Sequence, residues 1–495
     1  MKKPVSLFLI LVMALSIACL GHADDEAPYE FSLRTNVGDL TENDKIWLAG
    51  VEEKLNIKIN LILPATSAYV ESLQIMIASG EYDDLVLYNN GVKDPTYKEA
   101  VKNGLYIAVN DLLPDYPNLL QYTNAAEFDE LKILGDDQIY GVPRTTVNRA
   151  DGYAIRKDWL DNLGIPFPED GYLTTDELYD ILYAFTFKDP DGNGQNDTYG
   201  FTHYGTIAPI FQFTFGLIGW QDYDGEYMDL KYSKTADNYK RCLAFNNKLW
   251  MDGLFDPDWP TIGSNVMIDR LDSGVTGMCQ RFAGHMSTDV IKGQALNPDY
   301  ELGYIYGIVE NREDIENYRG SMFSTGSWGL WAISSQAEHP EKILGFLDYL
   351  ISDEGWWETQ SGPEGVAWNW VDGERVATDK YDSSIKSRNF GRRFGDASFF
   401  VHINTDKELR ELIVSRIQKC VDNCVDSLDY GFVPAVSDDP VFIDYNKYMA
   451  TEISKIITGA RPVDDWDEIL EGWYQAGGDQ YIAEMQAHIA ESQGK

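Results

Sequence analysis

The first part of the chain alternates between short apolar segments and longer amphipathic segments. Residues 30–34 and 57–63 have the pattern of strands, and residues 84–88 form a third, mostly apolar strand-like segment. Between them, residues 44–55 and 67–79 have the apolar spacing of helices. The order strand, helix, strand, helix, strand predicts a parallel sheet covered by helices.

The third of these segments ends in polar residues. Tyr88 closes it, and Asn89 and Asn90 lead into a turn at Gly91. Ligands of open α/β sheets bind beside the loops that follow the carboxyl ends of the strands. We therefore expect Tyr88 and Asn89 at a binding edge.

The pattern changes after residue 137. Residues 138–156 contain two strand-like segments with Arg144 between them, which predicts a chain crossing from one lobe to another. Thr174 and Glu177 have the spacing of a capping box and predict the start of a helix. Residues 362–373 are predicted to form a loop that carries tryptophans.

Length and charge narrow the function classes. A chain of 495 residues is too long for one hydrophobic core, so two or more domains are expected. The net charge of −40 excludes nucleic-acid binding as a reasonable function, because such a surface repels phosphate backbones. It also predicts a neutral ligand, unless a local basic patch overrides the overall field.

The aromatic content favours a sugar ligand. Aromatic residues make up 13% of the chain, with 13 Trp and 30 Tyr. Flat rings stack on the apolar faces of pyranoses, whereas sugar hydroxyls need polar neighbours. Most of these rings are nevertheless expected in the core.

The N-terminus indicates export. Lys2 and Lys3 precede an apolar segment over residues 5–20 and small residues up to Ala23, which is the layout of a secretory signal peptide. Two processing routes are open: cleavage after Ala23, with residues 1–23 removed, or lipidation of Cys19, with residues 1–18 removed. We expect an extracytoplasmic protein, with a lipid anchor as its only attachment to the membrane.

Residues 189–198 have the start of an EF-hand-type calcium loop. Oxygen side chains fall at alternate positions, and Gly194 stands at the sixth position, where the loop turns sharply. Gly200 replaces the usual bidentate Glu at position 12. The predicted ligands of a structural Ca²⁺ are Asp189, Asp191, Asn193, Gln195 and Asp197, with help from Thr198. The alternative is an Asx-rich turn that binds no metal.

No catalytic constellation is found in the sequence. The His residues do not have a zinc-type spacing, and neither a G-x-S-x-G elbow nor a P-loop occurs. An Asp/Glu pair of the glycosidase kind stays open, because carboxylates are abundant. Cys420 and Cys424 share a helix face and form either a strained disulfide or, as we favour, buried thiols.

Three motifs together resemble extracellular solute-binding protein family 1. They are Ile-Tyr-Gly-Val-Pro at 139–143, Ile-Arg-Lys-Asp-Trp-Leu-Asp-Asn-Leu-Gly at 155–164, and the loop at 189–200. The segments at 339–355, 362–366 and 477–481 also fit, and the similarity is closest to the lipoprotein and alginate-binding-protein-like branch. Pro363 departs from the family, which commonly has an aliphatic residue there.

The resemblance implies an α/β, two-lobed periplasmic-binding-protein-like fold of type II, with a hinge between the lobes. It implies an N-lobe of residues 27–143 and 310–375, and a C-lobe of residues 144–309 and 376–495. It further implies a monomer that closes on an oligosaccharide, docks to the two permease subunits of an ABC importer, and is not an enzyme. A secreted calcium-stabilised glycoside hydrolase and the ligand-binding subunit of a sensory system are the alternatives.

The predicted sugar-binding residues come from loop positions, strengthened by the likeness to maltose-type receptors. They are Tyr88, Asn89, Arg144, His203, Tyr204, Trp220, Arg281, Phe282, Trp328, Trp368 and Trp370.

Overall fold

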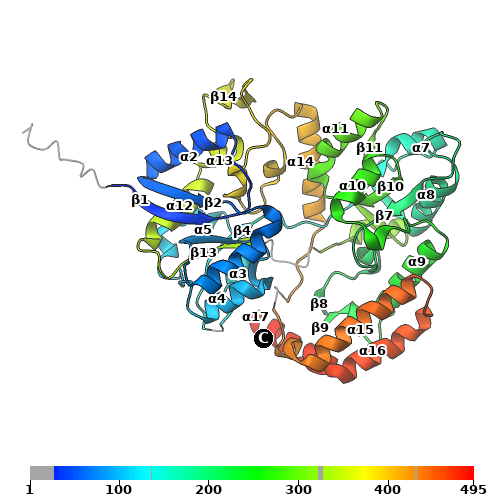
Figure 1. Ribbon diagram of the computed structural model, residues 1–495. Coiled ribbons are helices and arrows are strands. Elements are labelled where there is room, and N and C mark those ends of the chain that lie inside the picture. The colour runs from blue at the N-terminus through cyan, green and yellow to red at the C-terminus, as the bar shows by residue number, and fades with distance from the viewer. Residues whose placement is uncertain (1–26, 135, 322–326, 430–431, 495) are drawn as a thin grey trace, which may run out of the picture.

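The computed structural model describes residues 27–134, 136–321, 327–429 and 432–494. The signal segment and Cys19 lie outside these residues. The chain forms two lobes, seen on the left and right of Figure 1, each built on its own sheet. None of the described helices is long and apolar enough to cross a membrane.

The N-lobe is built on a five-stranded sheet with the order β2-β1-β3-β13-β4. Strands β1 (Tyr29–Arg34), β2 (Ile57–Ile62) and β3 (Leu85–Tyr88) are parallel. Strand β13 (Ser327–Ile333) pairs antiparallel with β3 and with β4 (Val142–Thr145). The parallel strands and their helices confirm the pattern expected from the first ninety residues.

Helices cover both faces of this sheet. They are α2 (Glu42–Leu55), α3 (Tyr69–Ser79), α4 (Pro95–Lys102), α5 (Pro117–Gln121), α6 (Ala125–Asp129), α12 (Pro340–Ile351) and α13 (Trp356–Ser361). One core joins Phe31, Leu33 and Trp331 of the sheet to Trp47 of α2 and Leu344 of α12. A second core lies on the other face, where Tyr88 and Val86 pack against α3 and α4.

The C-lobe is built on a four-stranded sheet with the order β11-β5-β10-β7. Its strands are β5 (Tyr153–Arg156), β7 (Tyr199–Thr202), β10 (Thr276–Gln280) and β11 (Leu302–Ile305). Around it lie α7 (Lys157–Leu163), α8 (Thr175–Phe187), α10 (Ser264–Asp272), α11 (Met286–Leu296) and α14 (Lys407–Asp422), and the short pair β6 (Tyr172–Thr174) and β12 (Gly307–Val309). The Thr174–Glu177 capping box opens α8 as predicted.

A helical layer completes the C-lobe, in orange and red in Figure 1. It contains α15 (Pro440–Ile457), α16 (Trp466–Trp473) and α17 (Asp479–Ser492), and α9 (Asn238–Met251), in green, packs against it. The hairpin of β8 (Trp220–Tyr223) and β9 (Glu226–Asp229) packs on it, and Trp220, Phe442 and Trp473 share its core. This core is separate from the one on β5 and β10.

The predicted loop at 362–373 contains a hairpin instead. Strands β14 (Trp368–Val371) and β15 (Glu374–Ala377) pair antiparallel around Asp372 and Gly373. Both turn residues have positive φ, 53° and 82°, as a type I′ turn requires. The Asp-Gly turn between alternating strands is therefore the signal that the loop prediction missed.

The chain passes between the lobes three times. The first crossing follows β4, since Ala150 already donates to Cys420 of α14. The second lies between Gly320, which donates to Asn423, and β13. The third comes after residue 394, because Lys386 and Ser387 still donate to Asp44 of α2, and the Arg393 guanidinium donates to Ile351. The boundary expected near Arg375 is thus about 20 residues too early.

Candidate functional site

Three of the predicted ligand residues, Asn89, Arg144 and Trp328, lie at one edge of the N-lobe. Asn89 is exposed directly after β3, and Trp328, at the start of β13, exposes 41% of its surface. Gly329 has a φ of 119° and lies so close to Tyr88 and Asn89 that a Cβ would be 2.6 Å from the Tyr88 carbonyl oxygen. Only glycine fits there, and the pairing of β13 with β3 places Gly329, the neighbour of Trp328 in the chain, against Asn89.

Arg144 ties this edge to the other crossing segments. Its side chain is 8% exposed, its Nε donates to the Asn389 carbonyl at 2.9 Å, and its Nη1 donates to the Trp328 carbonyl at 3.2 Å. Burial lowers the pKa of Arg144 to about 10, so the guanidinium is still charged at neutral pH. The Arg144 guanidinium therefore joins the segments of all three chain crossings.

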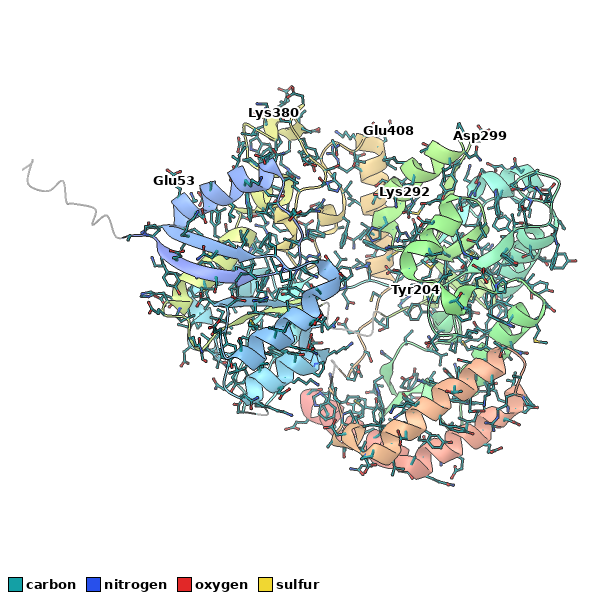
Figure 2. The ribbon with its side chains drawn as sticks, viewed as in Figure 1. Glu53, Tyr204, Lys292, Asp299, Lys380 and Glu408 are labelled. Atoms are coloured by element: carbon teal, nitrogen blue, oxygen red, sulfur yellow. The ribbon has the colours of Figure 1, made fainter. Side chains whose placement is uncertain are left out.

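Two predicted residues lie on the C-lobe, after β7. Tyr204, labelled in Figure 2, is 43% exposed, and its ring packs against His203. Burial lowers the pKa of His203 to about 4, so its imidazole is neutral at pH 7. An exposed phenol beside a neutral imidazole offers an aromatic face, a donor and an acceptor, which suits a sugar ring and its hydroxyls.

Five of the predicted ligand residues are core or structural side chains, and these predictions are corrected. Tyr88 has no exposed surface, and its hydroxyl is 2.6 Å from that of Tyr106. Trp220 is 3% exposed in the helical layer. Trp368 is 1% exposed, and its Nε1 donates to Gly362. All three residues lie in strands, and their side chains point into the protein because large apolar surface is more stable there.

The other two of these five are held by their own lobe. Arg281 makes two hydrogen bonds of 2.6 Å to Asp289, a carboxylate with no exposed surface. Phe282 is 6% exposed, and the Arg149 guanidinium lies 3.7 Å from its ring centroid. An ion pair this buried and bidentate is part of the C-lobe structure.

Trp370, on the hairpin β14–β15, is 48% exposed and lines a cavity of about 540 Å³. Arg375 lies in the same cavity with its guanidinium 3.7 Å from the Trp357 ring centroid. Arg410 and Val414 of α14 form the opposite wall. The hairpin of the N-lobe and a helix of the C-lobe therefore share this cavity.

Residues 388–400 were not among the predicted site residues. This segment leads into the third crossing and carries three Arg and four Phe but one acidic residue, Asp396. Arg388 and Arg392 flank the Phe399 ring, with guanidinium carbons 4.8 and 4.5 Å from its centroid. The signal that could have found it was this local excess of arginine in a chain of net charge −40.

The predicted calcium loop connects α8 to β7. Gly192 and Gly194 both have positive φ, and the Gly194 amide donates to Asp189 Oδ2 at 3.0 Å. The Asn193 side-chain nitrogen lies 2.8 Å from Asp191 Oδ2 and 3.3 Å from Asp197 Oδ1. The Asn193 side-chain nitrogen therefore lies between two carboxylates, a position that a bound cation could also occupy.

Two further observations test the fit. Asp189 Oδ1 is buried without a partner, and burial raises the pKa of Asp191, with Asp189 and Asp197 adding to the rise. Among the described residues no three His, Cys, Asp or Glu side chains are arranged to hold a metal, so a cation here also needs Asn193 and main-chain oxygens. The loop fits calcium in this mixed form. The buried hydroxyl of Thr198, the sixth predicted ligand, donates to the Phe185 carbonyl of α8.

The described cysteines settle the alternative left open for Cys420 and Cys424. Cys242, Cys279 and Cys420 are buried, Cys424 is half-buried, and none forms a disulfide within the described residues.

Residues 38–355 match the family model described as bacterial extracellular solute-binding protein. The chain belongs to this family. This solute-binding protein is 22% identical over 88% of its length to 86% of the polygalacturonan/rhamnogalacturonan-binding protein YtcQ of Bacillus subtilis. It is 26% identical to the lipoprotein LipO of the same organism, with 88% and 87% of the two chains covered.

The third relative is the fructooligosaccharide ABC transporter substrate-binding protein FusA of Streptococcus pneumoniae. Its sequence is 27% identical over 61% of this chain and 57% of its own. The FusA structure with kestose superposes with a TM-score of 0.67 at 19% identity, covering 94% of this chain and 99% of FusA. The expected two-lobed solute-binding fold is thereby confirmed.

Proposed function

We propose that this solute-binding protein is the oligosaccharide receptor of an ABC importer. The observation that carries the proposal is the exposure of Trp328 and Asn89 at one edge of the N-lobe, with exposed Tyr204 and neutral His203 on the C-lobe. Aromatic faces with neighbouring hydrogen-bonding groups are what a sugar groove needs. YtcQ and FusA, named for polysaccharide and oligosaccharide ligands, support the same substrate class.

The test is a calorimetric titration against a panel of oligosaccharides, with the sugars recovered and sized afterwards. A receptor binds a panel member and returns it intact, whereas a glycoside hydrolase shortens it within hours. Products that disappear when an acidic pair is mutated would establish the hydrolase instead. Failure of every panel member to bind would overturn the proposal.

The partners follow from the same function. The receptor acts as a monomer and delivers its ligand to the two permease subunits of the importer. It is held outside the cytoplasmic membrane, either free after cleavage at Ala23 or through a lipid on Cys19; LipO, a relative described as a lipoprotein, supports the second route. A neighbouring permease gene, rather than a sensor kinase gene, would distinguish import from sensing.

A structural calcium ion in the loop 189–197 belongs to the proposal. Asp189, Asp191, Asn193, Gln195 and Asp197 would hold it, and the bound ion would pin the connection between α8 and β7. The EF-hand recorded for FusA supports this assignment. The carboxylates serve the fold in this reading and take no part in acid–base chemistry.

A further inference from the structure

Arg392 is a buried cation whose hydrogen bonds are mostly unmade. Its side chain is 8% exposed, and its Nε and Nη1 have no partner in the structure. These two atoms carry three of the five N–H groups of a guanidinium. The remaining nitrogen reaches only Asn389 Oδ1, at 3.5 Å. Buried polar groups are normally paired, and an unpaired buried charge is costly.

Other arginines surround it. Burial holds the pKa of Arg392 well below its usual range, and the nearby charges of Arg144, Arg388 and Arg149 lower it further. Arg388 contacts the His402 ring, whose pKa burial lowers to about 4, so its partner there is neutral. Arg149 alone has a carboxylate, Asp151, at 2.8 Å.

Among the ion pairs of the described residues, none involves Arg144, Arg388 or Arg392. The chain carries 80 acidic residues, so carboxylates to neutralise these arginines were abundant. Aromatic rings stand where counter-ions would be expected: Trp328 and Phe399 lie 5.1 and 4.5 Å from the Arg392 guanidinium. Within the described residues, Arg144, Arg388 and Arg392 therefore have no carboxylate that neutralises their charge.

The cluster also lies at the proposed ligand edge. The Trp328 ring, 41% exposed, contacts Arg392 and carries the carbonyl that Arg144 binds. A sugar stacked on Trp328 would place its substituents next to these guanidinium groups. The net charge predicted a neutral ligand except where a local basic patch overrides it, and residues 144, 388 and 392 form such a patch.

We infer that the ligand is an anionic oligosaccharide, one whose carboxylate or sulfate group is bound by Arg392 with Arg144 and Arg388 around it. This inference rests on the proposed oligosaccharide function and adds the charge of the sugar. An anionic group supplies both the acceptors that the free N–H groups lack and the charge that offsets the arginines.

The test is calorimetry on matched pairs of sugars with the mature full-length chain. One pair is trigalacturonate and its methyl ester, and the other is a sulfated disaccharide and its desulfated form. At least one acidic member should bind about tenfold more tightly than its neutral counterpart, because charge-assisted hydrogen bonds are lost in the neutral form. The pair that shows the preference distinguishes a carboxylate ligand from a sulfate ligand.

Arg392→Gln should weaken binding of the acidic member at least about tenfold more than binding of the neutral one. Its melting temperature without ligand should not fall, since the change removes an unpaired buried charge. Arg312→Gln changes the net charge equally at a site paired with Asp170 and Glu177, and should leave both affinities unchanged.

Equal affinity for both members of each pair, or binding of neutral sugars alone, would overturn the inference and leave the receptor function standing. An acid preference that survives in Arg392→Gln would also overturn it. Binding of no oligosaccharide, acidic or neutral, would instead refute the proposed function.

Discussion

Trp220 and Trp328 are both tryptophans at the start of a strand, yet their surroundings differ. The Trp220 side chain is 3% exposed among helices of the C-lobe, and its backbone amide donates to Ser427 Oγ at 2.8 Å. Trp328 keeps 41% of its surface exposed and contacts Arg392. One ring contributes to folding, and the other is available to a ligand.

Trp220→Ala and Trp328→Ala should therefore have opposite effects. The first should lower the free energy of unfolding by about 3–5 kcal/mol, because it leaves a cavity in a packed core. The second should change that free energy by less than about 0.5 kcal/mol and weaken sugar binding tenfold or more, by loss of a stacked ring. Denaturant melts and calorimetry on both variants measure the two effects, and each variant is the control for the other. A destabilised Trp328→Ala with unchanged affinity would make that ring structural.

Among the single elements, the loop between α8 and β7 is the segment that we expect a bound divalent cation to stabilise. It holds the Asn193 side-chain nitrogen 2.8 Å from Asp191 Oδ2 and 3.3 Å from Asp197 Oδ1, and Asp189 Oδ2 accepts from the Gly194 amide. Like charges at this spacing repel, so the loop is less stable alone than with a bound divalent cation.

Chelation should lower the melting temperature, because calcium that binds only the native state adds about 2.7 kcal/mol at a hundredfold excess over its Kd. Asp189→Asn should have a reduced melting temperature in calcium and should respond less to chelator. Asp299→Asn, on an exposed turn of the C-lobe, is the matched control and should behave as wild type. A wild-type melt that is the same with and without chelator would exclude the calcium assignment.

At the scale of the whole molecule, three crossing segments join two lobes that have separate cores. Arg144 donates to carbonyls at residues 328 and 389, so it links the second and third crossings to the first. A ligand that touches both lobes only when they are closed shifts the population toward closure.

Small-angle scattering should therefore show a smaller radius of gyration when a binding oligosaccharide is added. Trp328→Ala at the same sugar concentration should show less of this change, because fewer molecules are liganded. An unchanged radius with saturating ligand would mean that binding involves one lobe or a preformed groove.

The local elements and the family could be predicted from the sequence alone. Alternating and helical spacing located the strands and helices of residues 29–88, the capping box of Thr174 opened α8, and the acidic loop at 189–197 was visible as a motif. Each of these features depends on residues only a few positions apart in the chain, so the spacing of residues in the sequence is enough to predict it.

The exposure of the predicted site residues, by contrast, follows from the tertiary structure. Tyr88, Trp220 and Trp368 were predicted from loop positions, but their exposure depends on distant elements that pack over them. The arginine cluster likewise joins Arg144 to Arg388 and Arg392, which lie far from it in the sequence. The exposure of these side chains, and the charges around them, depend on segments that lie far apart in the sequence. The local spacing of residues therefore could not predict them.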